Sequence, residues 1–196
     1  MGVEINLSHI EKLTRELNKA NNTLVKVGVL AGAQYPNGTD VAEVAKYLEY
    51  GWQQNITAKQ RAWFGVQGIH LKKNTTLNMP PRPFFRATAE AKKRDWFNVT
   101  KKALQGLGNS ANPLNQITQA LMLLGMTAQQ DVQDTIQDGG VGSASFAIRS
   151  PLTMLLYGNL LKGHRTDGTP NQSTVRKPLY KSGILSASIA YEIVKK

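Results

Sequence analysis

Three closely spaced prolines constrain the fold of this chain more than any other feature of its sequence. They stand in the block Met79-Pro80-Pro81-Arg82-Pro83. Because proline fixes φ at about −65° and has no backbone N–H, this block is excluded from a helix interior and from a central strand. The block therefore predicts a stiff, extended connection that fixes the start of a helix expected from about Phe84 to Leu107.

A second long helix is expected after Asn112 and Pro113, which have the pattern of an N-cap followed by a first-turn proline. It is expected to end near Asp138-Gly139-Gly140. The apolar residues expected on the buried faces are Ala87, Ala91 and Trp96 or Phe97 in the first helix, and Ile117, Leu121, Leu124 and Ala128 in the second. Their spacing is typical of helices that bury one side against a core.

Shorter periodic segments predict the remaining elements. They are an amphipathic helix over 7–20, a strand over 23–30, a short helix from Asp40 to Gly51 and a closing strand over 184–194. Residues 52–82 form a long insertion, within which 61–71 could pair as strands, and 141–176 remains ambiguous. The predicted class is α+β, a single domain over 1–196 with a small, mostly antiparallel sheet packed against two or three helices. Residues 52–82 would be an inserted loop or hairpin in that domain.

The net charge of +11 is concentrated in one part of the chain. Residues 58–102 contain eleven Lys and Arg but only two Asp and Glu, whereas residues 1–57 are close to neutral. Such a concentration suits a polyanion or an acidic protein partner. The alternative is that these side chains only solvate a surface, although a solvated surface more often mixes both signs.

Patterns typical of enzymes are weak. The chain has no cysteine, and His9, His70 and His164 are dispersed without metal-ligand spacing. The aspartates Asp131, Asp134 and Asp138 could share one helix face, as in a two-metal nuclease, but no partner His, Lys or Glu is recognisably placed beside them, and a solvated acidic helix end is the favoured interpretation. We therefore expect no enzyme, cofactor or metal. Neither a secretory signal nor a membrane-spanning stretch is visible, so a soluble protein of a cytosol-like compartment is expected.

Four segments, in order, resemble the tail-completion, or virion-morphogenesis, proteins of long-tailed bacteriophages. These segments are Val25-Lys26-Val27-Gly28-Val29, Tyr47-Leu48-Glu49-Tyr50-Gly51, the block from Met79 to Arg86, and 177–185 followed by Ser188-Ile189. The long insertion at 52–78 and the Gly- and Ser-rich segment 139–176 depart from the family pattern, which puts partner identity in doubt more than fold.

The resemblance implies a structural protein of the phage neck in the virion, assembled in the host bacterial cytoplasm. It would form a homo-oligomeric ring, plausibly hexameric, between the head-side connector or stopper protein and the tail terminator or tail tube. The genome would pass through the ring with non-specific DNA contact. Two alternatives stay open: a tail-terminator ring protein that caps the tube, and a non-specific DNA-binding packaging accessory protein.

Candidate site residues follow from this reading. Arg82 and Arg86 flank Phe84 and are expected to pair with carboxylates such as Glu49, within the fold or across a subunit boundary. The insertion would be a docking arm, with aromatic and basic residues as interface anchors. These anchors are Trp52, Lys59, Arg61, Trp63 and Phe64. The candidates for lining a DNA channel are Lys72, Lys73, Lys92, Lys93 and Arg94.

Overall fold

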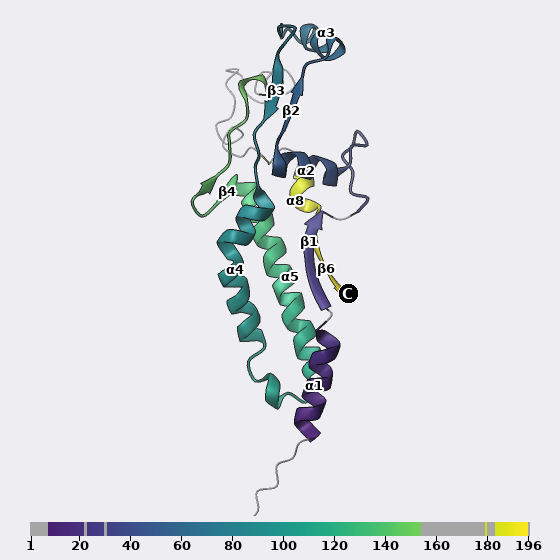
Figure 1. The fold of residues 1–196 in the computed structure, drawn as a ribbon, viewed down its shortest axis with the longest axis vertical. Coiled ribbons are helices and arrows are strands. Elements are labelled where there is room, and N and C mark those ends of the chain that lie inside the picture. The colour runs from purple at the N-terminus through teal and green to yellow at the C-terminus, as the bar shows by residue number, and fades with distance from the viewer. Residues whose placement is uncertain (1–7, 22, 30, 154–178, 180–182, 196) are drawn as a thin grey trace, which may run out of the picture.

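The computed structural model describes residues 8–21, 23–29, 31–153, 179 and 183–195, and the molecule is elongated (Figure 1). The predicted α+β class is confirmed. The helices are α1 (Ser8–Ala20), α2 (Val41–Tyr50), α3 (Ala58–Val66), α4 (Phe84–Ala103), α5 (Pro113–Asp138) and α8 (Ile184–Ala187), with a 3-10 turn at Leu107–Asn109. The strands are β1 (Thr23–Val29), β2 (Trp52–Asn55), β3 (Thr76–Met79), β4 (Gly140–Val141), β5 (Ala144–Ser145) and β6 (Ile189–Lys195).

Helix α5 forms the axis of the molecule (Figure 1). As expected, Asn112 caps it by accepting a hydrogen bond from the backbone N–H of Asn115, and Gly139 ends it with φ 75°. Helix α4 packs along one side of α5, and the antiparallel pair β1–β6 packs along another. The face of this sheet toward α5 includes Val27 and its cross-strand partner Tyr191. A third layer, α1, lies at the lower end of α5 (Figure 1).

The hydrophobic core lies where α2, the first turn of α4, the last turns of α5, helix α8 and the start of β6 meet. Its buried members are Val41, Ala45, Phe84, Val132, Ile136, Phe146, Leu179, Leu185 and Ile189. Between α4 and α5 the core contains one polar contact, because the buried hydroxyls of Thr88 and Thr135 lie 2.7 Å apart and share a hydrogen bond. Helix α4 is thus anchored at its N-terminal end, immediately after the proline block.

The insertion is an arm that projects from the end of α2. Strands β2 and β3 pair antiparallel, from Trp52 opposite Met79 to Asn55 opposite Thr76, and α3 forms the tip (Figure 1). Gly51 makes the bend into the arm with φ 71°, and a Cβ at this position would lie 2.7 Å from the carbonyl oxygen of Met79. Only glycine fits both the backbone angle and the approach of the returning strand.

Several boundaries differ from the sequence predictions. Residues 58–66 form helix α3, so the expectation that 61–71 pairs as strands is wrong. Thr57 and Gln60 make a full capping box there, a local signal that favours a helix start. The expected closing strand begins with the short helix α8 and becomes a strand only at Ile189. Helix α4 ends at Ala103, before the predicted Leu107. Leu7, Leu30 and residues 154–176 lie outside the described residues.

The expected buried side of α4 is also partly wrong. Phe97 is 66% exposed and Ala91 is exposed, whereas Trp96 is half-buried. The indole N–H of Trp96 donates a 2.7 Å hydrogen bond to the Asp131 carboxylate on α5. A polar contact between the helices therefore orients Trp96, and Phe97, one residue on, is rotated by about 100° around α4 and is exposed.

Candidate assembly site

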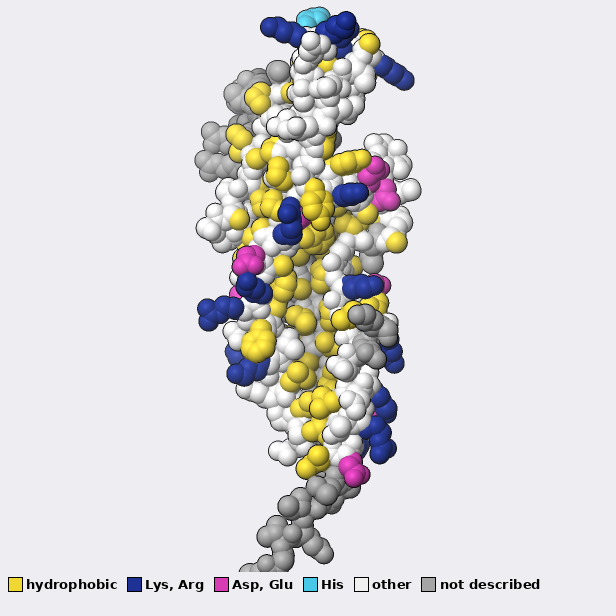
Figure 2. All heavy atoms as spheres, viewed as in Figure 1, with side chains coloured by type: hydrophobic (Ala, Val, Ile, Leu, Met, Phe, Trp, Pro, Cys, Tyr) yellow, Lys and Arg dark blue, Asp and Glu magenta, His cyan; other side chains and the backbone are white. Residues whose placement is uncertain are grey.

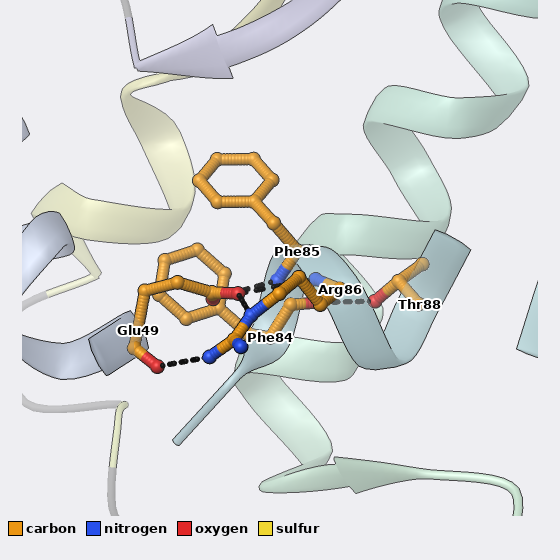
Figure 3. A network of polar contacts seen from close by, with 5 residues as sticks. All are labelled: Glu49, Phe84, Phe85, Arg86 and Thr88. Carbon is orange, nitrogen blue, oxygen red and sulfur yellow. Dashed lines mark hydrogen bonds and ion pairs between the residues drawn. The ribbon is translucent and has the colours of Figure 1, made fainter. Parts of the chain in front are cut away.

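The buried carboxylate of Glu49 caps α4 from a different helix. Its oxygens accept hydrogen bonds from the backbone N–H groups of Phe85 at 3.0 Å and Arg86 at 3.2 Å (Figure 3). The residue at the N-cap position is Pro83, which has no side-chain acceptor. The first backbone N–H groups of a helix have no acceptor within the helix. Glu49 supplies that acceptor for α4, because the proline block has no side-chain acceptor. A tertiary contact thus completes the start of α4.

Arg86 closes the same network. Its Nε donates to the Glu49 carboxylate at 2.9 Å, its Nη2 donates to the Glu49 carbonyl at 3.0 Å, and its guanidinium lies 4.9 Å from the centre of the Tyr50 ring. The expected pairing of Arg86 with Glu49 is therefore present within one chain. The side chain of Arg86 stays 59% exposed, so one edge of it faces solvent.

Within the chain, Arg82 does not pair with Glu49, unlike Arg86. Its Nε donates to the carbonyl of Ala147 at 2.9 Å, and its Nη2 donates to the carbonyl of Ile148 at 3.3 Å. The backbone N–H of Arg82 donates to the carbonyl of Leu48. Arg82 is therefore a buried residue, whose hydrogen bonds connect the proline block to the end of α2 and to the segment after β5.

The aromatic candidates divide between core and surface. Phe84 is fully buried, Phe64 is buried inside the arm, and Trp52 is half-buried at the base of the arm. In the single chain, Phe84 and Phe64 therefore contribute mainly to packing. Trp63 is exposed at the tip, with its ring edge-on to Phe64 at 5.0 Å.

The arm tip combines exposed apolar side chains with positive charge. Lys59, Trp63 and Val66 recur at helical spacing on α3, and Val66 is 84% exposed. Arg61 is half-buried on the opposite side of α3, while Lys72 and Lys73 are exposed between α3 and β3. No Asp or Glu occurs between residues 50 and 89. The tip is therefore a cationic and apolar surface with no carboxylate of its own.

The candidate channel residues fall into two groups. Lys72 and Lys73 are at the arm tip, whereas Lys92, Lys93 and Arg94 are on α4, in the body of the molecule (Figures 1 and 2). Lys92 pairs with Asp131 at 3.4 Å, and Lys93 pairs with Glu90. The structure therefore does not join the five residues into one basic patch, and two of the α4 cations are partly neutralised.

Figure 2 shows hydrophobic side chains along the middle of the body, with Lys and Arg on its flanks. On α5 itself, Met122, Leu123 and Met126 are exposed and lie within about 100° of one another around the helix, and we call these three the exposed apolar band of α5. Leu114 is also exposed, but on the side of the helix opposite to Leu123. On α1, Ile10 and Leu17 of the predicted amphipathic face are exposed as well. Monomeric proteins rarely leave large contiguous apolar surface in water, so this band is a candidate surface for an assembly contact.

The acidic residues of α5 do not form a common site. Asp131 accepts from Trp96 and pairs with Lys92, while Asp134 accepts from Gln130 on the same helix. In the described part of the chain, no group of three or more His, Asp or Glu side chains is placed to hold a metal ion. The described helices include none long and apolar enough to span a membrane.

Sequence reasoning missed two features, the exposure of three apolar side chains and the burial of one arginine. Val66, Met122 and Met126 are exposed, although their apolar character alone suggested burial. Continuing the 3.6-residue period of α5 would have placed both methionines away from its buried face. Arg149 is buried near Arg82, in a segment whose scattered Gly and Ser residues gave no periodic signal.

Comparison with known proteins found no family model, no curated protein and no solved structure that matches this chain.

Proposed function

We propose that this chain is a structural protein of the bacteriophage neck, which assembles as a ring that joins the DNA-filled head to the tail and lets the genome pass. The observation that carries the proposal is the exposed apolar band of α5, in which Met126 is 58% exposed. A band along the side of an elongated subunit suits contacts between neighbours that repeat around a closed ring. The resemblance of the four sequence segments to tail-completion proteins supports the same assignment.

The open edges of the β1–β6 sheet also support self-association. Among the described residues this sheet has two strands only, so each strand has one edge without a strand partner. Unpaired sheet edges readily add a strand or a neighbouring chain, and a sheet of two strands gains stability when it is extended. Together with the apolar band, these edges offer the subunit two kinds of lateral contact.

The Lys and Arg side chains of α4, on the flank of the body, suit a channel that binds DNA weakly. Contacts with phosphates are independent of sequence and weaken with salt, so the genome could still slide through. Head-side connector and tail-side proteins would then meet the two ends of the ring, with the arm as one contact. A tail terminator would use the same features at a different position in the virion.

The proposal is tested by cryo-electron microscopy of particles from a virus that lacks this gene. Filled heads beside separate tails are the expected result, and normally joined particles would exclude the joining role. Purified protein is also expected to form rings with weak affinity for DNA. A monomer with tight, salt-dependent DNA binding would instead indicate the accessory protein.

Replacing Met122 and Met126 together by glutamate is expected to convert the ring to monomers. Charges buried at an interface are costly, whereas both side chains are exposed in the single chain, so its fold should be retained. Size-exclusion chromatography with light scattering gives the assembly state, and circular dichroism gives the melting temperature. The matched control places the same charges on α4, as Ala91→Glu with Asn98→Glu, two exposed positions away from the band. Rings of full size from the methionine variant would show that the band is not the subunit contact.

Replacing Trp63 by alanine is expected to weaken docking of the arm without affecting rings. Exposed tryptophans at interface centres are often worth about 2 kcal/mol or more, which corresponds to roughly 30-fold in affinity. The measurement is the yield of infectious particles when purified protein is added to heads and tails that lack it. Ala62→Ser, also at an exposed position of α3, serves as the control. Equal yields from both variants would remove Trp63 as an anchor.

A further inference from the structure

A cavity of about 710 Å³ lies at the base of the arm, between α2, β3, α8 and the segment after β5. Its apolar lining includes Leu48, Trp52, Leu77, Met79, Leu152 and Ile184. Two arginines, Arg82 and Arg149, also line it, together with the hydroxyl-bearing residues Ser150 and Thr153. A cavity of this size accommodates a ligand of a few amino acid residues.

The guanidinium of Arg82 has N–H groups that its two backbone carbonyl acceptors do not use. It has five N–H bonds, of which one on Nε and one on Nη2 are used by the carbonyls of Ala147 and Ile148. No fully buried side-chain nitrogen or oxygen of the described residues lacks a hydrogen-bond partner. Nη1 of Arg82, which neither carbonyl uses, is therefore not fully buried, and the residue lines the cavity.

The charge of Arg82 has no carboxylate partner among the described residues. The residue is only 5% exposed. Burial, and secondarily the nearby positive charge of Arg149, lower the pKa of Arg82. A buried cation without a counter-ion is costly, and an anion that enters the cavity would remove that cost.

We propose that this cavity binds a carboxylate side chain presented by an apolar peptide segment of a neighbouring protein, with Arg82 as the anchor of the carboxylate. Arginine suits a carboxylate because its planar donors can make two parallel hydrogen bonds. The apolar lining suits the residues on either side of the acid, whereas a free phosphate would leave that lining in contact with water. That the ligand is a segment of a partner protein rests on the proposed function in assembly. That the site prefers a carboxylate flanked by apolar residues rests only on the residues that line the cavity.

The test measures binding of two matched peptides to the purified full chain by isothermal titration calorimetry. The probes are acetyl-Leu-Glu-Leu-amide and acetyl-Leu-Gln-Leu-amide, with inorganic phosphate as a competitor. We expect the acidic peptide to bind at least tenfold more tightly than the amide peptide. The Arg82→Gln variant is expected to lose this difference. Equal binding of the two peptides, no binding of either, or full displacement by equimolar phosphate would overturn the proposal.

A second variant keeps the test valid if Arg82→Gln fails to fold. Asn78 lines the cavity but is exposed, so Asn78→Asp should fold normally and weaken the acidic peptide several-fold by repulsion. Asn78→Ser is the neutral control and should bind like the unmodified chain. An acidic peptide that binds Asn78→Asp as well as the control would contradict the site. Ring size, measured separately by light scattering, reports on the proposed function, so failure of one can be told from failure of the other.

Discussion

The Glu49→Ala variant is expected to lose about 3 kcal/mol in the free energy of unfolding, because it leaves a helix start and a paired arginine without their acceptor. The carboxylate accepts from two backbone N–H groups of α4 and from Arg86 Nε. No other described side chain offers a cap there, because Pro83 precedes the helix. The loss should appear in urea unfolding followed by circular dichroism.

Two further variants separate the parts of this network. Glu49→Gln keeps an acceptor oxygen, so it should lose about 1–2 kcal/mol. Arg86→Met keeps the stem of a side chain that is mostly exposed, and should lose about 1 kcal/mol or less. Glu43→Ala is the matched control, at an exposed position of α2, the helix that also carries Glu49. Its free energy of unfolding should stay within about 0.5 kcal/mol of that of the unmodified protein. If Glu49→Ala were as stable as Glu43→Ala, the cap would not stabilise α4.

Gly125→Ala is expected to destabilise the protein by about 1–3 kcal/mol, although alanine is the better helix former. Gly125 lies in the middle of α5, where the ring of Tyr191 from β6 packs directly on the helix backbone. A Cβ at this position would lie 2.7 Å from Cγ and 2.8 Å from Cε2 of that ring, and closer still to Cδ2. Either the ring or the sheet must therefore move. Thermal unfolding of the purified chain gives the measurement.

The matched control for this prediction is Gly65→Ala. Gly65 is also in a helix, α3, but a Cβ there would meet nothing within 4 Å, so a gain of up to about 1 kcal/mol is expected. A partial rescue of Gly125→Ala by Tyr191→Leu would confirm that the ring is the obstacle. If both glycine variants gained stability, the close packing of β6 on α5 would be wrong.

Local signals in the sequence predicted much of the secondary structure. The Asn112–Pro113 pair and Gly139 marked both ends of α5 because capping depends on residues within one turn of the helix end. The proline block likewise marked the start of α4 at Phe84. The helix in the arm replaces the strand pairing expected within 61–71, although Thr57 and Gln60 have capping-box spacing.

The sequence by itself determined the α+β class, the two long helices and the position of the inserted arm, because spacing and capping are properties of neighbouring residues. Only the tertiary structure decided which partners the charged side chains take. Glu49 meets α4 and Arg82 turns away from it toward Ala147, because the arm returns the chain beside α2. It also decided that Met122 and Met126 remain exposed while Gly125 is covered, since the sheet packs against only one side of α5. Such contacts join residues far apart in the chain, and no local pattern specifies them.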